Sequence, residues 1–530
     1  MTQALHVDAT CTPEWLAALH RPTAYSHAVR EITLLETHLS WVFLTGDWAY
    51  KLKKPLRFSF VDFSTIDKRH AACLEELRLN RRTAAVLYDQ VVPLVETEAG
   101  PRFGSTGKVL EYAVRMRQFP QADILLNVAK SGRLTETMVV ALSRSIAALH
   151  RQASVVAQES GFGISAVIRR EMSDCLEELA HSGLCAGATA FLTQVRTWAD
   201  AEGERLEPHF AMRRRDGFVR ECHGDLHLGN IVLVDGAPVP FDCIEFNPEL
   251  RFTDVVNDVA FVTMDLHSLE FSRLAWQFLN GWLEESGDFG GLIGFRYYQV
   301  YRALVRAKVA AIRLSQGGDA TESLNHQDEV RRYLALAADL SRPTQPALIL
   351  MHGVSGSGKS TVARRISGEL AGIRIRSDVE RKRLFGAWPP EPGVHPPDDL
   401  YSPQATSRTY EHLLAVTERL LGEGFLVIVD AAFLREYDRL RFRQLARRLQ
   451  CPWIIACCEA DDRVLEERVN ARQAAGGDPS DATVAVLNAQ RQSSDRLTDD
   501  EDARTVRFRT DEGDSWNRKL DELRRLTLSE

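Results

Sequence analysis

The chain has 530 residues, about three times a typical domain length, which is enough for two large domains or three smaller ones. Its hydrophobic content of 45% and charged content of 26% are ordinary for globular proteins and exclude bulk disorder. A net charge of −8 argues against a chain that coats nucleic acid or anionic membranes by bulk electrostatics, although it is compatible with a local basic groove.

The nine cysteines show no C-x-x-C spacing, and Cys243 and the pair Cys457-Cys458 lie in apolar segments. Reduced, buried thiols are therefore expected in preference to disulfides or a metal site. The first residues, MTQALHVDAT, lack a basic segment followed by an apolar core, and no apolar run is long enough to span a bilayer. We therefore expect a cytoplasmic protein without a membrane partner.

The first predicted elements form a small lobe at about residues 25–118. Residues 32–53 alternate apolar segments with polar turns and predict an antiparallel three-stranded meander. The segment 71–87 predicts an amphipathic helix whose apolar positions are Leu74, Leu77, Val86 and Leu87. A strand pair over 90–96 and 110–119 leads out of this lobe.

The pattern is mainly helical from Leu134 to about Arg205, and helices return after a strand, loop and strand over 223–246. The polar segment 341–346 holds two prolines and is the best linker candidate. After it, continuous apolar strands alternate with amphipathic helices, which predicts a parallel sheet covered on both faces. Domains are thus predicted over residues 1–340 and 347–530.

The most specific motif is a phosphate-binding loop. Residues Gly353–Thr361 fit G-x-x-x-x-G-K-[ST] directly after a predicted strand and directly before a predicted helix. Backbone N–H groups of such a loop wrap phosphates, and the helix N-terminus adds positive charge. Lys359 is expected to reach the β and γ phosphates of ATP, and the Ser360 hydroxyl to ligate Mg²⁺. The residues predicted to bind nucleotide are Gly353, Ser355, Gly356, Ser357, Gly358, Lys359, Ser360 and Thr361; a ligand-free glycine turn is the alternative.

Charged residues follow the next strands of this half, where open α/β sheets place their ligands. Asp378 in the segment RSDVER is the candidate base and Arg381 the candidate substrate-binding group, with a helix N-cap as the alternative role for Asp378. Asp430 closes the strand FLVIVD and is either a Mg²⁺ ligand through water or a loop residue. Arg468 and Arg472, before the loop AAGGDPS, predict a phosphate-clamping lid, with solvated arginines as the alternative.

This half, from about Ala347 to Thr510, resembles small P-loop kinases of the polynucleotide kinase, gluconate kinase and zeta-toxin group. The D-x-x-R element of phage-type polynucleotide kinase carries a base and a substrate-phosphate arginine, roles that the resemblance gives to Asp378 and Arg381. A lid with two arginines four apart corresponds to Arg468 and Arg472. The resemblance favours a kinase over a mechanical ATPase, because no sensor or arginine-finger segment is seen.

A second constellation lies in the first half. His223-Gly-Asp225, then Asn230, then Asp242 after a second strand, has the spacing of a phosphotransferase catalytic loop and metal-binding turn. Asp225 would orient and deprotonate an acceptor hydroxyl, and Asn230 and Asp242 would hold Mg²⁺ on the nucleotide phosphates. A purely structural loop is the alternative.

Cys222 to Asn230 read C-H-G-D-L-H-L-G-N, which resembles the loop of aminoglycoside phosphotransferase-like kinases. The resemblance covers roughly Ile32 to Leu340. It implies a small-lobe lysine that contacts the α and β phosphates and pairs with a helix glutamate. Lys51 and Lys53 share one face of a strand; Lys51 is preferred, paired with Glu76, with Glu75 as the fallback partner.

Departures from protein kinases point toward a small-molecule phosphotransferase. No G-x-G-x-x-G loop is present, so Thr37–Ser40 would have to cover the nucleotide, and Asp242 is followed by Cys-Ile-Glu. The acceptor pocket is expected between about Ser131 and Arg205. The basic run Arg213–Arg215 is expected to be a solvated loop, or else to recruit RNA or an anionic metabolite. Supporting or capping roles, in preference to metal ligation, are expected for Glu245, Asp254 and Asp258.

The sequence therefore predicts an α+β bilobal kinase-like domain followed by an α/β P-loop NTPase domain with a parallel sheet. The leading hypothesis is an ATP- and Mg²⁺-dependent bifunctional phosphotransferase acting on hydroxyl acceptors, either small molecules or the 5′-hydroxyl ends of RNA or DNA. In one alternative only the P-loop half is catalytic and the first half recruits substrate. In another the chain is an ATP-gated regulatory or toxin-like binding protein.

Overall fold

The computed structural model describes residues 13–58, 61–182, 189–315, 320–389, 399–475, 482–512 and 516–528. Contacts divide the chain into two compact units. Unit 1 extends to Ile168 and includes Phe210–Val262; unit 2 comprises Arg169–His209 and Thr263–Glu530. The proposed linker over 341–346 lies in a stretch without helix or strand. Within the described ranges, no helix has the length and apolar character needed to cross a membrane.

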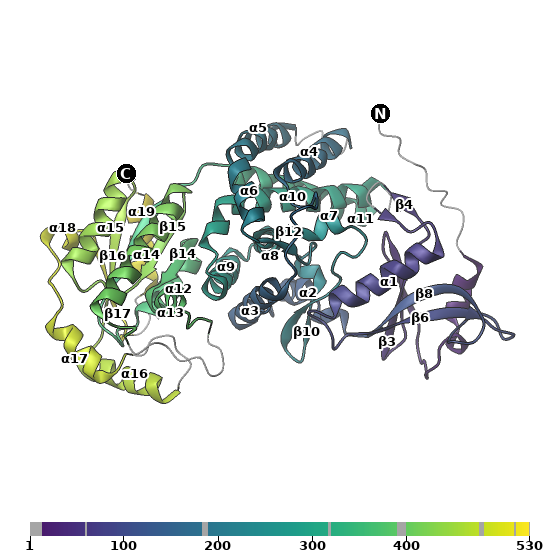
Figure 1. Cartoon of the computed structure of the whole chain (residues 1–530), viewed down its shortest axis with the longest axis horizontal. Helices are drawn as coiled ribbons and strands as arrows, with labels where there is room; N and C mark the ends of the chain where they lie inside the picture. Colours follow the sequence, from purple (N-terminus) through teal and green to yellow (C-terminus); the bar gives the residue numbers. More distant parts are fainter. Residues whose placement is uncertain are drawn as a thin grey trace. The chain divides into compact units, whose positions relative to one another are not determined.

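Unit 1 contains a six-stranded antiparallel sheet in the order β1-β2-β3-β8-β6-β7 (Figure 1). The predicted meander over 32–53 is confirmed as its first three strands, and the predicted strand pair as β6 and β8. Buried Phe43, Tyr50 and Leu52 pack on one face of the sheet. The strands are β1 (Thr33–Glu36), β2 (Ser40–Leu44), β3 (Trp48–Lys53), β6 (Tyr88–Glu96), β7 (Arg102–Phe103) and β8 (Lys108–Arg117).

Helix α1 (Ile66–Asn80) packs on this sheet and differs from its prediction at both ends and in its buried face. Thr65 caps it by accepting a hydrogen bond from the Lys68 N–H at 3.3 Å. The expectation of a helix to residue 87 with Leu74 and Val86 inside is wrong, because these side chains are 49% and 66% exposed. The helix stops at Asn80, and its inward face carries the fully buried carboxylate of Glu76.

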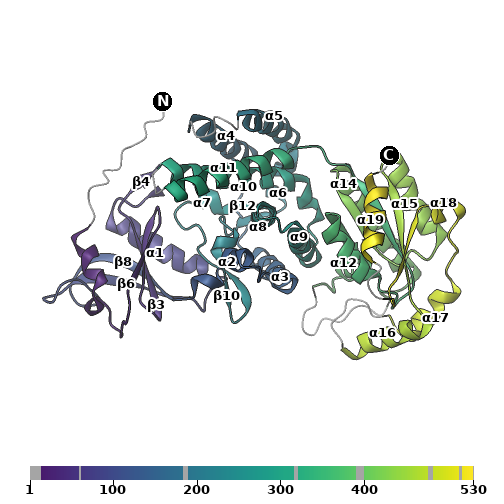
Figure 2. The same ribbon diagram turned by 180° about the vertical axis from the view of Figure 1, so that it is seen from behind.

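The rest of unit 1 surrounds the catalytic-loop motif. The hairpin β10–β11 and the pair β9–β12 flank it in sequence, and helices α2, α3 and α7 contact β10, β11 and β12, respectively (Figure 2). The bounds are β9 (Val219–Glu221), β10 (Ile231–Val234), β11 (Ala237–Pro240), β12 (Phe252–Asp254), α2 (Leu125–Lys130), α3 (Glu136–Gln152), α7 (Pro248–Arg251) and α8 (Val255–Ser268).

The expectation that Arg213–Arg215 form a solvated loop is wrong, because these residues are the last turn of helix α6 (Glu207–Arg215). Arg213 is 1% exposed and bonds both oxygens of Asp254 at 2.6 and 2.7 Å. Arg214 donates to backbone carbonyls, including those of Ser160 and Phe162 at 2.6 and 3.0 Å. A run of like charges gave no sign that two of its members have buried or backbone partners. Arg215 alone keeps the predicted exposure.

Unit 2 contains a five-stranded parallel sheet in the order β14-β15-β13-β16-β17, as predicted. Ile349 and Met351 of β13 pack in a cluster with residues of α12 and α19, whereas Leu348 and Leu350 point to the opposite face and are equally buried. Both faces are therefore covered, and the predicted fold class is confirmed. The strands are β13 (Ala347–His352), β14 (Gly372–Arg376), β15 (Leu426–Asp430), β16 (Trp453–Glu459) and β17 (Thr505–Arg509).

The helices of unit 2 follow the predicted alternation after residue 347. They are α12 (Lys359–Glu369), α13 (Ser377–Leu384), α14 (Pro403–Gly422), α15 (Glu436–Arg448), α16 (Asp462–Ala475), α17 (Val484–Gln492), α18 (Asp499–Asp502) and α19 (Trp516–Leu528). Before the linker lie α5 (Thr189–Arg205), α9 (Ser272–Ser286), α10 (Leu292–Ser315) and α11 (Ala320–Leu340), while α4 spans Ser165–His181. All seven described cysteines are free and buried, as expected.

Candidate active sites

In unit 1, two lysines and three carboxylates form an ion cluster that is buried apart from the Asp242 side chain, which is 37% exposed. Lys51 and Lys53 project from β3 toward Glu76 of α1, and the Lys51 Nζ to Glu76 Oε1 distance is 2.9 Å. Lys51 also pairs with Asp242, and Lys53 pairs with Glu76 and with Glu245. The structure therefore joins Lys51 to Glu76, the preferred partner, and adds Lys53 to the same cluster.

The charges of this cluster support one another. Burial acts to lower the pKa of Lys51, but Asp242 and Glu76 hold that pKa well above its ordinary value. Burial acts to raise the pKa of Glu76, but the two lysines hold it below its ordinary value. The two lysines and Glu76 therefore stay ionised at neutral pH, whereas burial raises the pKa of Glu245 against the charge of Lys53.

The catalytic-loop motif places its predicted base and its predicted amide ligand side by side. Asn230 Nδ2 donates to Asp225 Oδ2 at 2.9 Å and to the Asp225 carbonyl at 3.0 Å. Because the amide nitrogen turns to Asp225, the Asn230 Oδ1 atom is the one that a metal ion would meet. The Phe241 N–H donates to the Asn230 carbonyl at 2.9 Å, which connects this residue to the segment carrying Asp242.

Asp258 holds the backbone of the catalytic loop. Its carboxylate accepts hydrogen bonds from the N–H groups of His223 and Gly224 at 2.8 and 3.0 Å, and lies 3.4 Å from His150 Nε2. Burial acts to raise the pKa of Asp258, but the hydrogen bond with His150 and further interactions lower it to about 2. Asp258 thus holds the loop backbone, in line with the supporting role expected for it.

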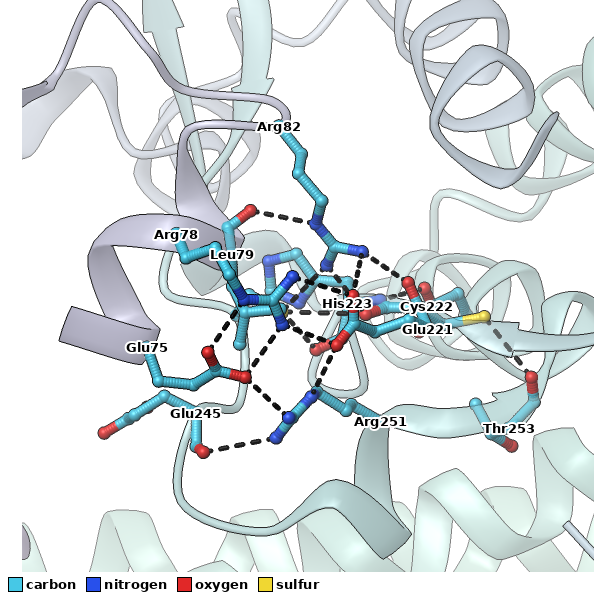
Figure 3. A network of polar contacts seen from close by, with 12 residues as sticks. Glu75, Arg78, Leu79, Arg82, Glu221, Cys222, His223, Glu245, Arg251 and Thr253 are labelled. Carbon is cyan, nitrogen blue, oxygen red and sulfur yellow. Dashed lines mark hydrogen bonds and ion pairs between the residues drawn. The ribbon is translucent and has the colours of Figure 1, made fainter. Parts of the chain in front are cut away.

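Figure 3 shows how the end of α1 is tied to the strand that leads into this loop. Arg78 Nη2 lies 2.6 Å from Glu221 Oε1, and Arg82 Nη2 donates to the Cys222 carbonyl at 3.1 Å. Arg251 joins the same group by pairing with Glu75 at 2.7 Å. Glu75, the fallback partner for Lys51, is therefore used in this network. The helix that carries Glu76 and the loop that carries Asp225 are held as one assembly.

In unit 2, the P-loop backbone closes tightly enough to require its glycines. Gly353, Gly356 and Gly358 have φ values of +139°, +82° and +83°. A Cβ atom on Gly353 would lie 2.5 Å from the Cys458 carbonyl oxygen, and one on Gly356 would lie 2.7 Å from the Leu465 carbonyl oxygen. Only glycine therefore fits these turns.

The P-loop side chains predicted to contact phosphate and metal make contacts with the loop itself and with Asp430. Lys359 is folded over the loop and donates to the Val354 carbonyl at 2.8 Å. Burial lowers the pKa of Lys359, against the charge of Asp430. Ser360 Oγ donates to Asp430 Oδ1 at 3.3 Å, and the buried Asp430 Oδ2 has no hydrogen-bond partner among the described residues. A hydroxyl beside an unsatisfied carboxylate oxygen fits a hard cation such as Mg²⁺.

The candidate base Asp378 and the candidate substrate-binding residue Arg381 both lie on α13 but differ in exposure. Asp378 is half-buried at its first turn, and its charge acts on Lys359. Arg381 is 7% exposed and donates to the Leu400 carbonyl and to Thr406 Oγ1, each at 3.1 Å. Its Nε atom has no partner among the described residues. Arg381 is thus held in place by Leu400 and Thr406.

The two arginines of the predicted lid also make different contacts. Arg468 donates to the Thr510 hydroxyl and carbonyl, each at 2.8 Å, and to the Gly356 carbonyl at 3.3 Å. Arg472 donates to the Ala482 carbonyl at 3.4 Å. Arg468 therefore touches the P-loop itself. Residues 476–480 of the predicted lid loop lie outside the described residues.

Sequence reasoning missed several residues that hold the P-loop. Gln490 Oε1 accepts from the Ser355 N–H at 2.8 Å, and Thr510 Oγ1 donates to the Ser357 carbonyl at 3.0 Å. Ser357 Oγ is buried without a partner among the described residues. Neither Gln490 nor Thr510 lies in a motif, so only the fold reveals them. Lys53 was considered with Lys51, because the two share a strand face, but Lys51 was preferred.

Known proteins are similar to this chain over different parts of its length. The AAA domain family matches residues 348–497. The uncharacterized protein Rv2004c of Mycobacterium tuberculosis (strain ATCC 25618 / H37Rv) is 33% identical over 473 residues, which cover 88% of this chain and 91% of that protein. A choline/ethanolamine kinase family protein from Mesorhizobium loti is 13% identical, covering 58% of this chain and 93% of its own, with a TM-score of 0.33. A gluconokinase from Sinorhizobium meliloti 1021 is 22% identical, covering 35% and 91%, with a TM-score of 0.23.

Proposed function

We propose that this chain, which belongs to the family of the mycobacterial protein Rv2004c, is an ATP-dependent bifunctional phosphotransferase. Each half would move the γ-phosphate of ATP to a hydroxyl acceptor. The observation that carries the proposal is the connected set of contacts in unit 1, in which Asp225 meets Asn230 and Asp242 meets Lys51. The P-loop with Ser360 beside Asp430 supports a second, separate transfer site.

In the kinase-like site, Asp225 accepts the proton of the acceptor hydroxyl as the new oxygen–phosphorus bond forms and the bond from the γ-phosphorus to ADP breaks. Lys51 offsets the charge of the nucleotide phosphates once a ligand competes for it with Asp242. Asn230 and Asp242 would hold Mg²⁺, which neutralises phosphate charge when bound. Glu76 keeps Lys51 aimed into the site through their 2.9 Å contact.

In the P-loop site, Lys359 and the loop N–H groups bind the β and γ phosphates, and Ser360 and Asp430 would hold Mg²⁺. Asp378 takes the proton of the acceptor hydroxyl, and Arg381 and Arg468 position anionic groups of the substrates. The acceptor for this site is a small-molecule alcohol or the 5′-hydroxyl end of a nucleic acid.

The test uses labelled ATP with a metabolite extract, and separately with a 5′-hydroxyl oligonucleotide. The wild type is compared with Asp225→Ala and Lys359→Ala, and labelled products are identified by mass spectrometry. Asp216→Ala and Lys519→Ala serve as controls, because both side chains form exposed surface ion pairs. We expect one set of products to disappear with each active-site variant and none to disappear with the controls.

Each outcome decides between the hypotheses. If Asp225→Ala changes nothing while Lys359→Ala abolishes all transfer, only the P-loop half is catalytic. Tight ATP binding with no transfer to any hydroxyl would refute both activities and favour an ATP-gated binding protein. Lack of label on the oligonucleotide at saturating ATP would exclude the 5′-hydroxyl acceptor.

A further inference from the structure

Helix α9, which precedes the linker in sequence, is packed within unit 2 against the P-loop fold. It contacts α12, the helix that begins with Lys359, and β14, one of the two edge strands of the parallel sheet. The packing is close: a Cβ atom on Gly368 of α12 would lie 2.9 Å from Arg273 Cγ of α9. Figures 1 and 2 both show α9 beside α12.

The side chain of Asn280 on α9 completes the open edge of β14. Asn280 Nδ2 donates to the Gly372 carbonyl at 2.9 Å, and Asn280 Oδ1 accepts from the Arg374 N–H at 2.7 Å. One amide thus supplies the donor and the acceptor that a neighbouring strand would supply. An edge strand otherwise leaves such groups unpaired.

One turn further along α9, the Glu284 carboxylate binds two arginines of β14. Its Oε2 lies 2.8 Å from Arg374 Nη2, and its Oε1 lies 2.6 Å from Arg376 Nη1. Arg374 also donates through Nη1 to the Ser360 carbonyl at 3.2 Å. Burial acts to raise the pKa of Glu284, but the two arginines lower it, so the carboxylate is ionised at neutral pH.

The end of α9 also holds the far end of α13. The Glu284 carbonyl accepts from Arg383 Nη2 and from Trp388 Nε1, the latter at 2.9 Å. Arg376 directly precedes α13, the helix that carries Asp378, and Arg383 lies in its last turn. Glu284 therefore holds both ends of the helix that bears the candidate base, and reaches Ser360 through one guanidinium.

We propose that Glu284 is a positioning residue of the P-loop site, which aligns Ser360 and the Asp378 helix through Arg374 and Arg376. The P-loop kinase would then be incomplete without α9, although α9 lies before the linker. The effect on kcat that this inference predicts rests on the proposed function. The effect on the order of β14 and α13 rests on the contacts alone.

The experiment compares Glu284→Gln with Glu423→Gln in the full-length chain. Glu423 is a matched control: its side chain is 20% exposed, as is that of Glu284, and it pairs with Arg205 of α5 at 2.9 Å. It precedes β15 and so lies at the opposite end of the strands from Asp378. Both changes remove one carboxylate that joins a helix before the linker to the P-loop fold.

Two readouts are measured for each variant, in an Asp225→Ala background. The first is kcat and KM for loss of the labelled γ-phosphate from ATP, either by transfer to the oligonucleotide or by hydrolysis. We expect Glu284→Gln to lower kcat by roughly tenfold or more through misplacement of the reacting groups, with a smaller change in the KM for ATP. Glu423→Gln should leave both unchanged, and Glu284→Asp should recover part of kcat.

The second readout is amide hydrogen exchange over 372–384, which does not require activity. We expect faster exchange there in Glu284→Gln and wild-type exchange in Glu423→Gln. If the two variants behave alike in both readouts, or if Glu284→Gln leaves exchange unchanged, the positioning role is refuted. If the wild type releases no γ-phosphate, the proposed function fails, and the exchange result alone decides the positioning role.

Discussion

The buried carboxylate of Glu76 offers the sharpest test of how the kinase-like site is held together. We consider Glu76→Gln, which keeps the shape of the side chain and removes its charge. Glu76 is fully buried and lies between Lys51 and Lys53, whose side chains are 11% and 1% exposed. Removing one partner from a buried ion pair costs about 3–5 kcal/mol. Because Lys51 keeps Asp242 and Lys53 keeps Glu245, we expect the lower end, about 3 kcal/mol.

The pH dependence has a definite sign. Lys51 and Lys53 hold the pKa of Glu76 below its ordinary value against the effect of burial, so the folded state binds the proton more weakly than the unfolded chain. The stabilisation is therefore fully present above the unfolded pKa of about 4.3 and is lost as the pH falls through the folded pKa. Glu76→Gln should flatten this acid-side loss of stability.

The assay is amide hydrogen exchange over β3 and α1, with urea unfolding followed by tryptophan fluorescence. The matched control is Glu75→Gln, one residue away. Its side chain is 28% exposed and pairs with Arg78 and Arg251, so its loss should cost about 1 kcal/mol or less. Equal effects of the two variants, or a larger effect of Glu75→Gln, would refute the assignment of Glu76 as the central carboxylate.

Three further predictions test other parts of the chain. Arg213→Met should lower the free energy of unfolding by about 3–5 kcal/mol, because it leaves a buried carboxylate unpaired, whereas exposed Arg215→Met should have no measurable effect on the thermal transition. Gly353→Ala should remove the P-loop site from the two ATP-binding sites counted by calorimetry, because its Cβ would lie 2.5 Å from a carbonyl oxygen, whereas Gly422→Ala, with open space around it, should keep both sites. Asp430→Asn should weaken Mg²⁺-dependent ADP binding to the P-loop half roughly tenfold or more, and chelation of Mg²⁺ should remove the difference from wild type.

The features that could be predicted from the sequence are those that depend on residues close together in the chain. The P-loop is readable because its glycines, lysine and hydroxyl are contiguous, and the strands around it are marked by continuous apolar runs. The pairing of Lys51 with Glu76 was predicted only through a family resemblance. Lys53 was considered beside Lys51 but not preferred, because lysines on a strand face are typical of a solvated surface and the sequence does not show that a buried carboxylate lies between the two.

Helix α1 and the segment that follows it illustrate the opposite case. Leu74 and Val86 are apolar yet exposed, while Glu76 is charged and fully buried. A hydrophobic pattern assigns the buried face by polarity, and so it fails where an ion cluster takes the place of an apolar core. The error therefore falls at the candidate active site, where local preference and the demands of binding differ most.

Glu284 and Asn280 show what no motif in the chain could reveal. Both lie on an ordinary amphipathic helix about ninety residues before the strand they bind, so their roles depend on a contact that only the fold creates. The same contact bears on how the two halves of the chain could evolve or be separated. A fragment that began at residue 347 would lose the amide that completes the edge of β14 and the carboxylate that pairs Arg374 and Arg376. Its edge strand would be open and its two arginines would lack this partner, so the P-loop half should depend on α9 for an ordered Asp378 helix.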